Sequence, residues 1–218
     1  MGTQPYKIDG KRVPSVTTVI SNCKIGGIEP LLFWANRCGL EGKNHREVSD
    51  KAADAGTCAH AMIEADIRGL IFDDEPYYDE TIRLAEHCFE SYLKWKQQTN
   101  LTLIGSEVSL ISEKYKYGGT LDAMATNQGL VLGDWKTSGG VYPDHLIQLS
   151  AYEQLWNENN PDNPVTGGAI LLRIGRPDHP DDPVSFHHHY WDNLSVAFET
   201  FLKMREIYDL HKRLKSFC

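Results

Sequence analysis

The feature that most constrains this chain is a run of three strand-like segments in its middle. Apolar and polar residues alternate over Leu103–Ser112, Lys116–Thr126 and Leu130–Thr137. A polar turn separates the first two segments, and Asn127-Gln128-Gly129 separates the last two. Because alternation with period two and short turns are typical of antiparallel strands, we expect a three-stranded meander. The fold must therefore be built around a sheet.

Helical patterns flank this meander on both sides. Expected helices cover Pro30–Leu40, Glu47–Arg68, Asp79–Gln98, Tyr142–Asn159 and a segment from a cap at Asp192 to Leu214, and further strands are expected at Ala169–Ile174 and Val184–Tyr190. Val16–Ile20 is β-branched and fits either a strand or a short helix. This order predicts an α/β (α+β) fold, in which helices flank a central mixed β-sheet and an N-terminal helical extension precedes it.

Length and composition predict one domain over residues 1–218. The chain is 41% hydrophobic, which is enough for one sizeable core. We expect residues 1–100 to form a mainly helical N-terminal part and residues 101–218 to form the sheet-containing catalytic core. The sequence has neither a signal-peptide pattern nor an apolar run that could span a bilayer. These features predict a cytoplasmic protein without a membrane partner, with an organelle as the alternative.

Charge and cysteine usage limit the classes of function. The net charge of -8 argues against a surface that attracts polyanions everywhere, so any nucleic-acid site must be local. An acidic surface also suits a protein partner. The five cysteines are scattered and form no C-x-x-C pair, which argues against a disulfide framework or a zinc knuckle.

Turn positions predict which side chains meet on the meander. If Gln128 is the middle of its turn, Asp122 lies directly opposite Asp134, with β-carbons roughly 4.5–5.5 Å apart. Lys136 then shares the face of Asp134 because side chains alternate along a strand. The same arithmetic at the preceding turn places Glu107 across from Asp122. A row of carboxylates beside one lysine is expected, unless a β-bulge shifts the register.

This row of carboxylates indicates a divalent metal site. Crowded carboxylates repel one another and persist where a hard cation such as Mg²⁺ or Mn²⁺ lies between them. Taken singly, each residue is more simply a solvated acid or ion pair. The joint pattern, at the end of the apolar segment Leu130-Val131-Leu132, favours a metal-dependent hydrolysis in which Lys136 either orients the attacking water or stabilises developing negative charge.

Short motifs around these residues resemble a known family. The motifs are G-G-T-L-D at Gly118–Asp122, D-W-K-T at Asp134–Thr137 and Q-L-S-A-Y at Gln148–Tyr152, with upstream pieces at Pro14–Ile20 and Ala55–Glu64. In spacing and order they resemble the PD-(D/E)xK nuclease superfamily, within it the RecB-like exonuclease branch. The upstream pieces are similar to the mitochondrial-genome-maintenance type of exonuclease and its phage counterparts. The likeness covers most of the chain.

The resemblance implies a restriction-endonuclease-like core and assigns roles to named residues. Asp122, Asp134 and the backbone carbonyl of Trp135 would bind Mg²⁺ or Mn²⁺, and Lys136 would be catalytic. His60 would be an additional metal ligand. Glu107, placed in the row by the turn arithmetic, could bind a second cation or lie behind the metal ligands, and the sequence does not decide between the two. One departure is that the second acid is Asp134, where glutamate is commoner in the superfamily.

Further residues are candidates for support of the site or contact with substrate. His60 and Glu64 lie four apart on an expected helix, as do Gln148 and Tyr152, so each pair shares a face. Without the resemblance, these are more simply surface or packing residues. Hydroxyls and cations that suit phosphate contacts are found at Ser15, Thr17, Arg173 and Arg176.

The function expected is a DNA exonuclease that acts on single strands or DNA ends in recombination, repair or phage DNA metabolism, in a bacterial or phage-infected cell. A structure-specific or restriction-type endonuclease of the same superfamily is the alternative, and a catalytically idle nucleic-acid-binding module is a rival of another class. A protein partner from a recombination or replication complex is compatible with these functions. Because only Cys218 follows Cys88, we expect no iron–sulfur cluster of the kind related nucleases build on downstream cysteines.

Overall fold

A five-stranded mixed sheet forms the centre of the computed structural model, which describes residues 5–23, 27–175 and 183–217. Its strands lie in sequence order: β3 (Thr102–Ser112), β4 (Tyr117–Thr126), β5 (Leu130–Lys136), β6 (Ala169–Ile174) and β7 (Phe186–Trp191). Neighbouring strands are antiparallel except β5 and β6, which are parallel. The parallel pair needs a crossover, and α5 (Pro143–Asn159) supplies it.

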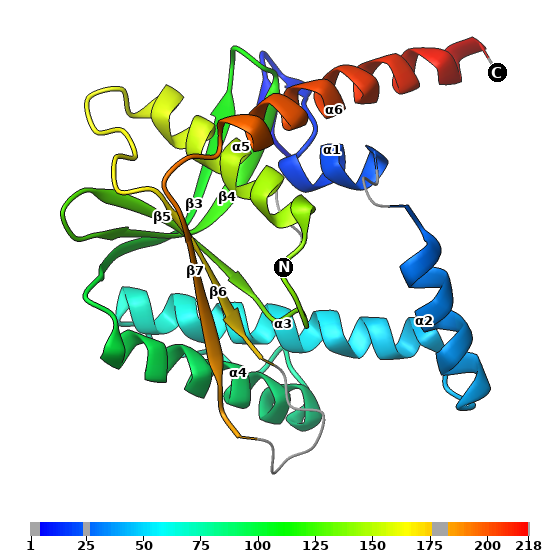
Figure 1. The fold of residues 1–218 in the computed structure, drawn as a ribbon, viewed down its shortest axis with the longest axis vertical. Coiled ribbons are helices and arrows are strands. Elements are labelled where there is room, and N and C mark those ends of the chain that lie inside the picture. Colours follow the sequence, from blue (N-terminus) through cyan, green and yellow to red (C-terminus); the bar gives the residue numbers. More distant parts are fainter. Residues whose placement is uncertain (1–4, 24–26, 176–182, 218) are drawn as a thin grey trace.

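Helices cover both faces of the sheet (Figure 1). One face packs against α3 (His45–Arg68) and α4 (Asp79–Gln98), where Trp95 and Trp135 are buried. The other packs against α5, α1 (Val16–Cys23) and α6 (Ser195–Leu214). The remaining elements are α2 (Glu29–Leu40), a small hairpin of β1 (Lys7–Ile8) and β2 (Lys11–Arg12), and a 3-10 turn at Lys215–Phe217.

The predicted fold class is confirmed: a mixed sheet is flanked by helices and preceded by a helical part, consistent with a restriction-endonuclease-like core. Val16–Cys23 is a helix, which settles the choice left open by its β-branched residues. The cap expected at Asp192 is wrong. The α6 helix begins at Ser195, and Asn193 accepts the hydrogen bond from the Ser195 amide at 2.8 Å. No helix in the described part of the chain is long and apolar enough to cross a membrane.

The strand register follows the turn arithmetic. Ala123 pairs with Gly133 across β4 and β5, as expected for a turn centred on Gln128. On the other side of β4, the partners of Leu121 and Ala123 are Val108 and Ser106. Glu107 therefore lies across from Asp122, and the bulge in this strand pair occurs further along, between Leu103 and Gly105.

The alternation of side chains breaks at Asp122. Leu121 packs in the α5/α6 core, whereas Ala123, two residues later, packs in the α3/α4 core. Across from this break, Glu107 has a φ of 52°, in the left-handed region that non-glycine residues rarely adopt. This local irregularity in two adjacent strands sets where the carboxylates of Glu107 and Asp122 point.

Candidate metal centre and active site

Three side chains from different elements converge beside the break in β4. His60 comes from α3, Glu107 from β3 and Asp122 from β4, and each offers one ligand atom within 4.8 Å of the others. His60 Nδ1 lies 3.7 Å from Asp122 Oδ2. All three side chains are partly exposed, so the group is open to solvent. One imidazole and two carboxylates form a donor set that fits a divalent cation.

The pKa of Glu107 is raised by its place among the acids of this group. Burial, the charge of Asp122 and the charge of Glu64 raise the pKa of Glu107 to about 7, and only Arg68 acts in the opposite direction. The carboxylate is therefore costly to ionise where it lies. A bound cation would offset this cost.

A second acidic group lies next to the first and carries its own counter-ion. Asp134 is fully buried, and Lys136 Nζ lies 2.7 Å from its Oδ2 and 3.0 Å from its Oδ1. Burial raises the pKa of Asp134, and Asp122 adds to this while Lys136 opposes it. For Lys136, burial acts to lower the pKa, but attraction by Asp134 and Asp122 outweighs it and the pKa is raised. Lys136 is thus a protonated group held at the site.

Asp122 links the two acidic groups. Its Oδ2 accepts a hydrogen bond from the Trp135 amide at 2.9 Å, at the point where β5 leaves the β4 ladder. The side chain of Trp135 points away, into the α3/α4 core. Asp122 thereby connects β4, β5 and, through His60, α3.

The structure brings the five principal residues together but divides them into two groups. His60, Glu107 and Asp122 form the triad that fits a metal, and Asp134 pairs with Lys136. Asp134 lies outside the triad of mutually close ligand atoms in the described residues. Metal binding by Asp134 and by the Trp135 carbonyl stays a prediction.

Glu64 forms an ion pair with Arg68, a residue that sequence reasoning missed. Arg68 Nη1 lies 2.9 Å from Glu64 Oε1, and Arg68 Nη2 donates to the carbonyl of Ser106 at 3.1 Å. This connection holds α3 against β3 one residue before Glu107. The i,i+4 spacing of Glu64 and Arg68 was a usable signal for it. The close approach of Gly56 in α3 to Thr137 is a second contact between the helix and the site strand.

Gln148 and Tyr152 form a pair on α5. Gln148 Nε2 donates to the Tyr152 hydroxyl at 2.9 Å. Burial, followed by the charges of Asp122 and Asp134, raises the pKa of Tyr152 well above its usual value, so the hydroxyl is neutral. The ring lies over Gly119, where a β-carbon would overlap it. This explains the second glycine of the G-G-T-L-D motif.

His145 is another residue near the site that the sequence did not single out. Burial and the charge of Lys136 lower its pKa to about 4. Its Nδ1 accepts a hydrogen bond from the Tyr142 amide at 3.3 Å, which requires a neutral ring and caps the start of α5. The residue therefore positions the helix that carries Gln148 and Tyr152.

The proposed phosphate contacts lie in different places. Ser15 Oγ bonds Thr17 Oγ1 at 3.0 Å at the start of α1, where Ser15 also bridges Gly118 of β4. Arg173 on β6 pairs in register with Lys136 on β5, so it lies next to the strand that carries Asp134 and Lys136. Arg176 lies outside the described residues.

No family model and no curated protein sequence matches the chain. Among solved structures, the chain is similar to a protein named SSO0001, with 19% identity, 68% of each chain covered and a TM-score of 0.34. It is also similar to an alkaline exonuclease, LHK-Exo, from Laribacter hongkongensis, with 14% identity over 59% of this chain and 71% of that one and a TM-score of 0.30. For LHK-Exo in complex with dAMP the identity is 15%, the coverage 77% and 92%, and the TM-score 0.34. These TM-scores are too low for the likenesses to assign a role to any residue of the site.

Proposed function

We propose that this protein is a divalent-metal-dependent nuclease that hydrolyses phosphodiester bonds of DNA. The observation that carries the proposal is the triad of His60, Glu107 and Asp122 next to the buried Asp134–Lys136 pair. Phosphodiester hydrolysis needs positive charge to offset the negative charge that develops on the phosphate. A cation at the triad and the ammonium of Lys136 would supply it from two adjacent points.

The triad would hold the metal, and Asp134 and the Trp135 carbonyl are proposed as further ligands. Mixed nitrogen and carboxylate donors favour Mn²⁺ over Mg²⁺, because Mg²⁺ prefers oxygen ligands. When bound, the cation supplies Lewis acidity and lowers the pKa of a coordinated water.

The other residues act through charge and position. Lys136 remains protonated and would donate hydrogen bonds to an oxygen of the scissile phosphate. The neutral hydroxyl of Tyr152, oriented by Gln148, would support the same end of the site. Glu64 acts through Arg68 and keeps α3, and with it His60, in place.

The substrate we propose is a single strand or a DNA end, processed as an exonuclease in recombination, repair or phage DNA metabolism. The motif resemblance and the local nature of the cationic groups on an acidic chain support it. Covalently closed single-stranded circles distinguish this from the alternative endonuclease. If circles are cut as fast as linear strands, the exonuclease assignment is wrong.

A cleavage assay with matched variants tests the activity itself. Labelled linear single- and double-stranded DNA would be incubated with Mn²⁺, with Mg²⁺ or with EDTA. We expect Asp122→Asn and Lys136→Gln to lower the rate by about 10²–10³, the usual effect of removing one stabilising group. Lys203→Gln is the matched control, because Lys203 pairs with Glu206 on α6. Equal rates in wild type and the site variants would show that another protein makes the product, which would overturn the proposal.

A further inference from the structure

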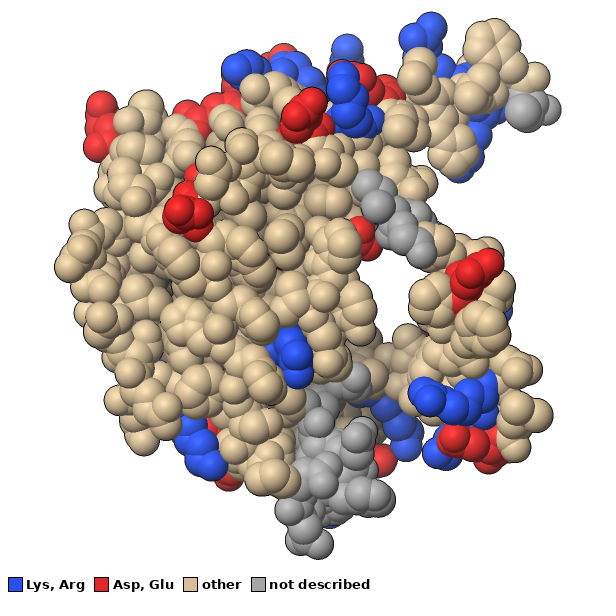
Figure 2. All heavy atoms as spheres, viewed as in Figure 1, with Lys and Arg blue, Asp and Glu red and all other residues tan. Residues whose placement is uncertain are grey.

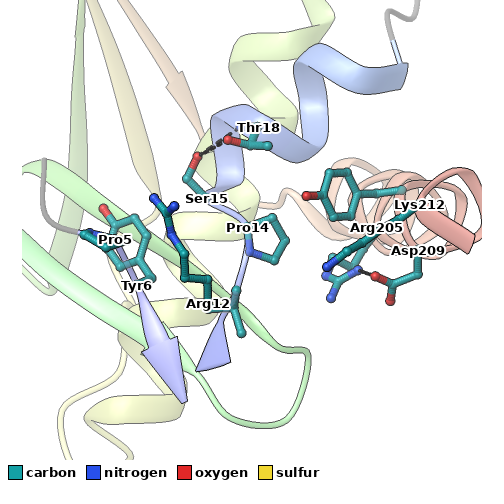
Figure 3. Close-up of a pocket in the computed structure, with 11 residues that line it drawn as sticks. Pro5, Tyr6, Arg12, Pro14, Ser15, Thr18, Arg205, Asp209 and Lys212 are labelled. Atoms are coloured by element: carbon teal, nitrogen blue, oxygen red, sulfur yellow. Dashed lines mark hydrogen bonds and ion pairs between the residues drawn. The ribbon is translucent and has the colours of Figure 1, made fainter. Parts of the chain in front are cut away.

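A cavity of about 500 Å³ lies on the α1/α6 side of the molecule, between the β1–β2 hairpin, the start of α1 and the end of α6 (Figure 3). We call it the α1–α6 pocket. The polar residues that line it come from all three elements: Arg12, Ser15, Thr18, Arg205, Asp209 and Lys212. Because segments from both ends of the chain meet here, the pocket is a product of the tertiary fold.

The pocket carries a surplus of positive charge in a chain whose net charge is -8. Arg12 and Lys212 are exposed, and neither has a carboxylate partner among the described residues. Arg205 is different, because its Nε and Nη2 donate to the Lys116 carbonyl and its Nη1 pairs with Asp209. Three cations therefore face one acid. The last turn of α6 is basic, and Figure 2 shows Lys and Arg side chains toward that end of the helix, with acidic side chains among those further back.

Hydroxyl groups lie beside these cations. Ser15 Oγ accepts a hydrogen bond from the Thr18 amide at 3.0 Å and bonds Thr18 Oγ1 at 2.8 Å. Figure 3 shows Arg12 extending from the hairpin toward Ser15, with Arg205 and Lys212 across the cavity. Guanidinium, ammonium and hydroxyl donors that face one open cavity are the groups proteins use to hold phosphate oxygens.

The pocket is joined to the acidic triad through β4. Ser15 bridges Gly118, and the hydroxyl of Tyr6, another lining residue, bonds Thr120 Oγ1 at 2.7 Å. Asp122 follows two residues later. At about 3.3 Å per strand residue, the path from Gly118 to Asp122 is roughly 13 Å. A few nucleotides of an extended strand would span it.

We propose that the α1–α6 pocket binds an internal phosphate of a nucleic-acid strand whose scissile bond lies at the triad. The inference rests on the proposed nuclease function and adds a second, non-catalytic anchoring point for the substrate. Arg12 and Lys212 bind the phosphate, and Arg205, fixed by Asp209 and Lys116, forms the wall of the pocket. The distance between the bound phosphate and the triad then determines which phosphodiester bond is cut.

Binding measured without cleavage tests this subsite. Affinity for a fluorescein-labelled single strand would be followed by anisotropy in EDTA over a range of salt concentrations. Each of Arg12→Gln and Lys212→Gln should weaken binding and reduce the slope of log affinity against log salt by about 0.7, the contribution of one phosphate contact on a single strand. Asp209→Asn should strengthen binding, because it removes the one acid. Lys203→Gln, on the same helix but outside the pocket, is the control.

A small substrate separates failure of the subsite from failure of the nuclease. Bis(p-nitrophenyl) phosphate is a single phosphodiester and is too short to reach both places. Its Mn²⁺-dependent hydrolysis should be the same in wild type, Arg12→Gln and Lys212→Gln. Unchanged salt slopes in both variants would overturn the subsite, whatever the hydrolysis rate. Changed slopes without Mn²⁺-dependent cleavage of linear DNA by wild type would support the subsite as a phosphate site and overturn the nuclease assignment.

Discussion

The two acidic groups of the site are balanced in different ways. Asp134 is fully buried, and its charge is matched by Lys136 at 2.7 Å. Glu107 and Asp122 are partly exposed, and His60 offers a ligand atom within 4.8 Å of a carboxylate oxygen of each. The buried acid, Asp134, therefore has a counter-ion within the chain. Among the described residues, the partly exposed pair, Glu107 and Asp122, has no lysine or arginine held against it in the same way. The difference indicates which carboxylates need a cation from outside.

The largest effect on stability is expected from removing Lys136, the counter-ion of Asp134. Lys136→Met leaves Asp134 buried without a counter-ion and should lower the free energy of unfolding by about 3–5 kcal/mol, measured by urea denaturation at neutral pH. The double variant Asp134→Asn, Lys136→Met removes both charges and should recover most of this loss. A single variant within about 1 kcal/mol of wild type, or a double variant no more stable than the single, would contradict the comparison.

A smaller effect on stability is expected from adding a divalent cation that binds the triad. Mn²⁺ at about one hundred times its dissociation constant should raise the free energy of unfolding by about 2.7 kcal/mol, because it binds only the folded triad. The measurement is a thermal or urea unfolding curve with and without Mn²⁺. Asp122→Asn and His60→Ala should abolish most of the gain, whereas Lys203→Gln should keep it. Stabilisation that survives the first two substitutions would place the ion elsewhere.

The smallest effect concerns the backbone that holds the accessible acids. Glu107 has a φ of 52°, so Glu107→Gly should be more stable than Glu107→Ala by about 1 kcal/mol in the absence of metal. Both variants remove the carboxylate and should lose stabilisation by Mn²⁺ equally. An alanine variant at least as stable as the glycine variant would show that the left-handed conformation carries no strain.

Much of the sheet was predictable because residues close together in the sequence determine it. The alternation of apolar residues and the two tight turns determine the register of β3, β4 and β5, so the sequence alone is enough to place Glu107 across from Asp122. The apolar segment Leu130-Val131-Leu132 likewise indicated a buried strand, and β5 is buried up to Lys136.

What the sequence did not reveal depends on irregular backbone and on long-range packing. A regular strand gives no signal that Glu107 adopts a left-handed conformation or that the alternation breaks at Asp122. Asp122 lies near Asp134, as the register predicted, but its contact with His60 across the α3–sheet interface was given only by resemblance. The α1–α6 pocket is lined by Arg12 and Lys212, which lie far apart in the sequence and border one cavity only in the folded chain.

Arg68 connects α3 to β3, and the geometry of the triad depends on this packing of the helix against the sheet. The triad takes His60 from the helix and both carboxylates from the sheet, so it exists only while the helix is docked. A local opening that lifts α3 would separate the ligands and leave the strands paired. Amide hydrogen exchange of α3 therefore reports how much of the time the centre is assembled, and an ion shared between helix and sheet would slow that exchange in proportion to its affinity.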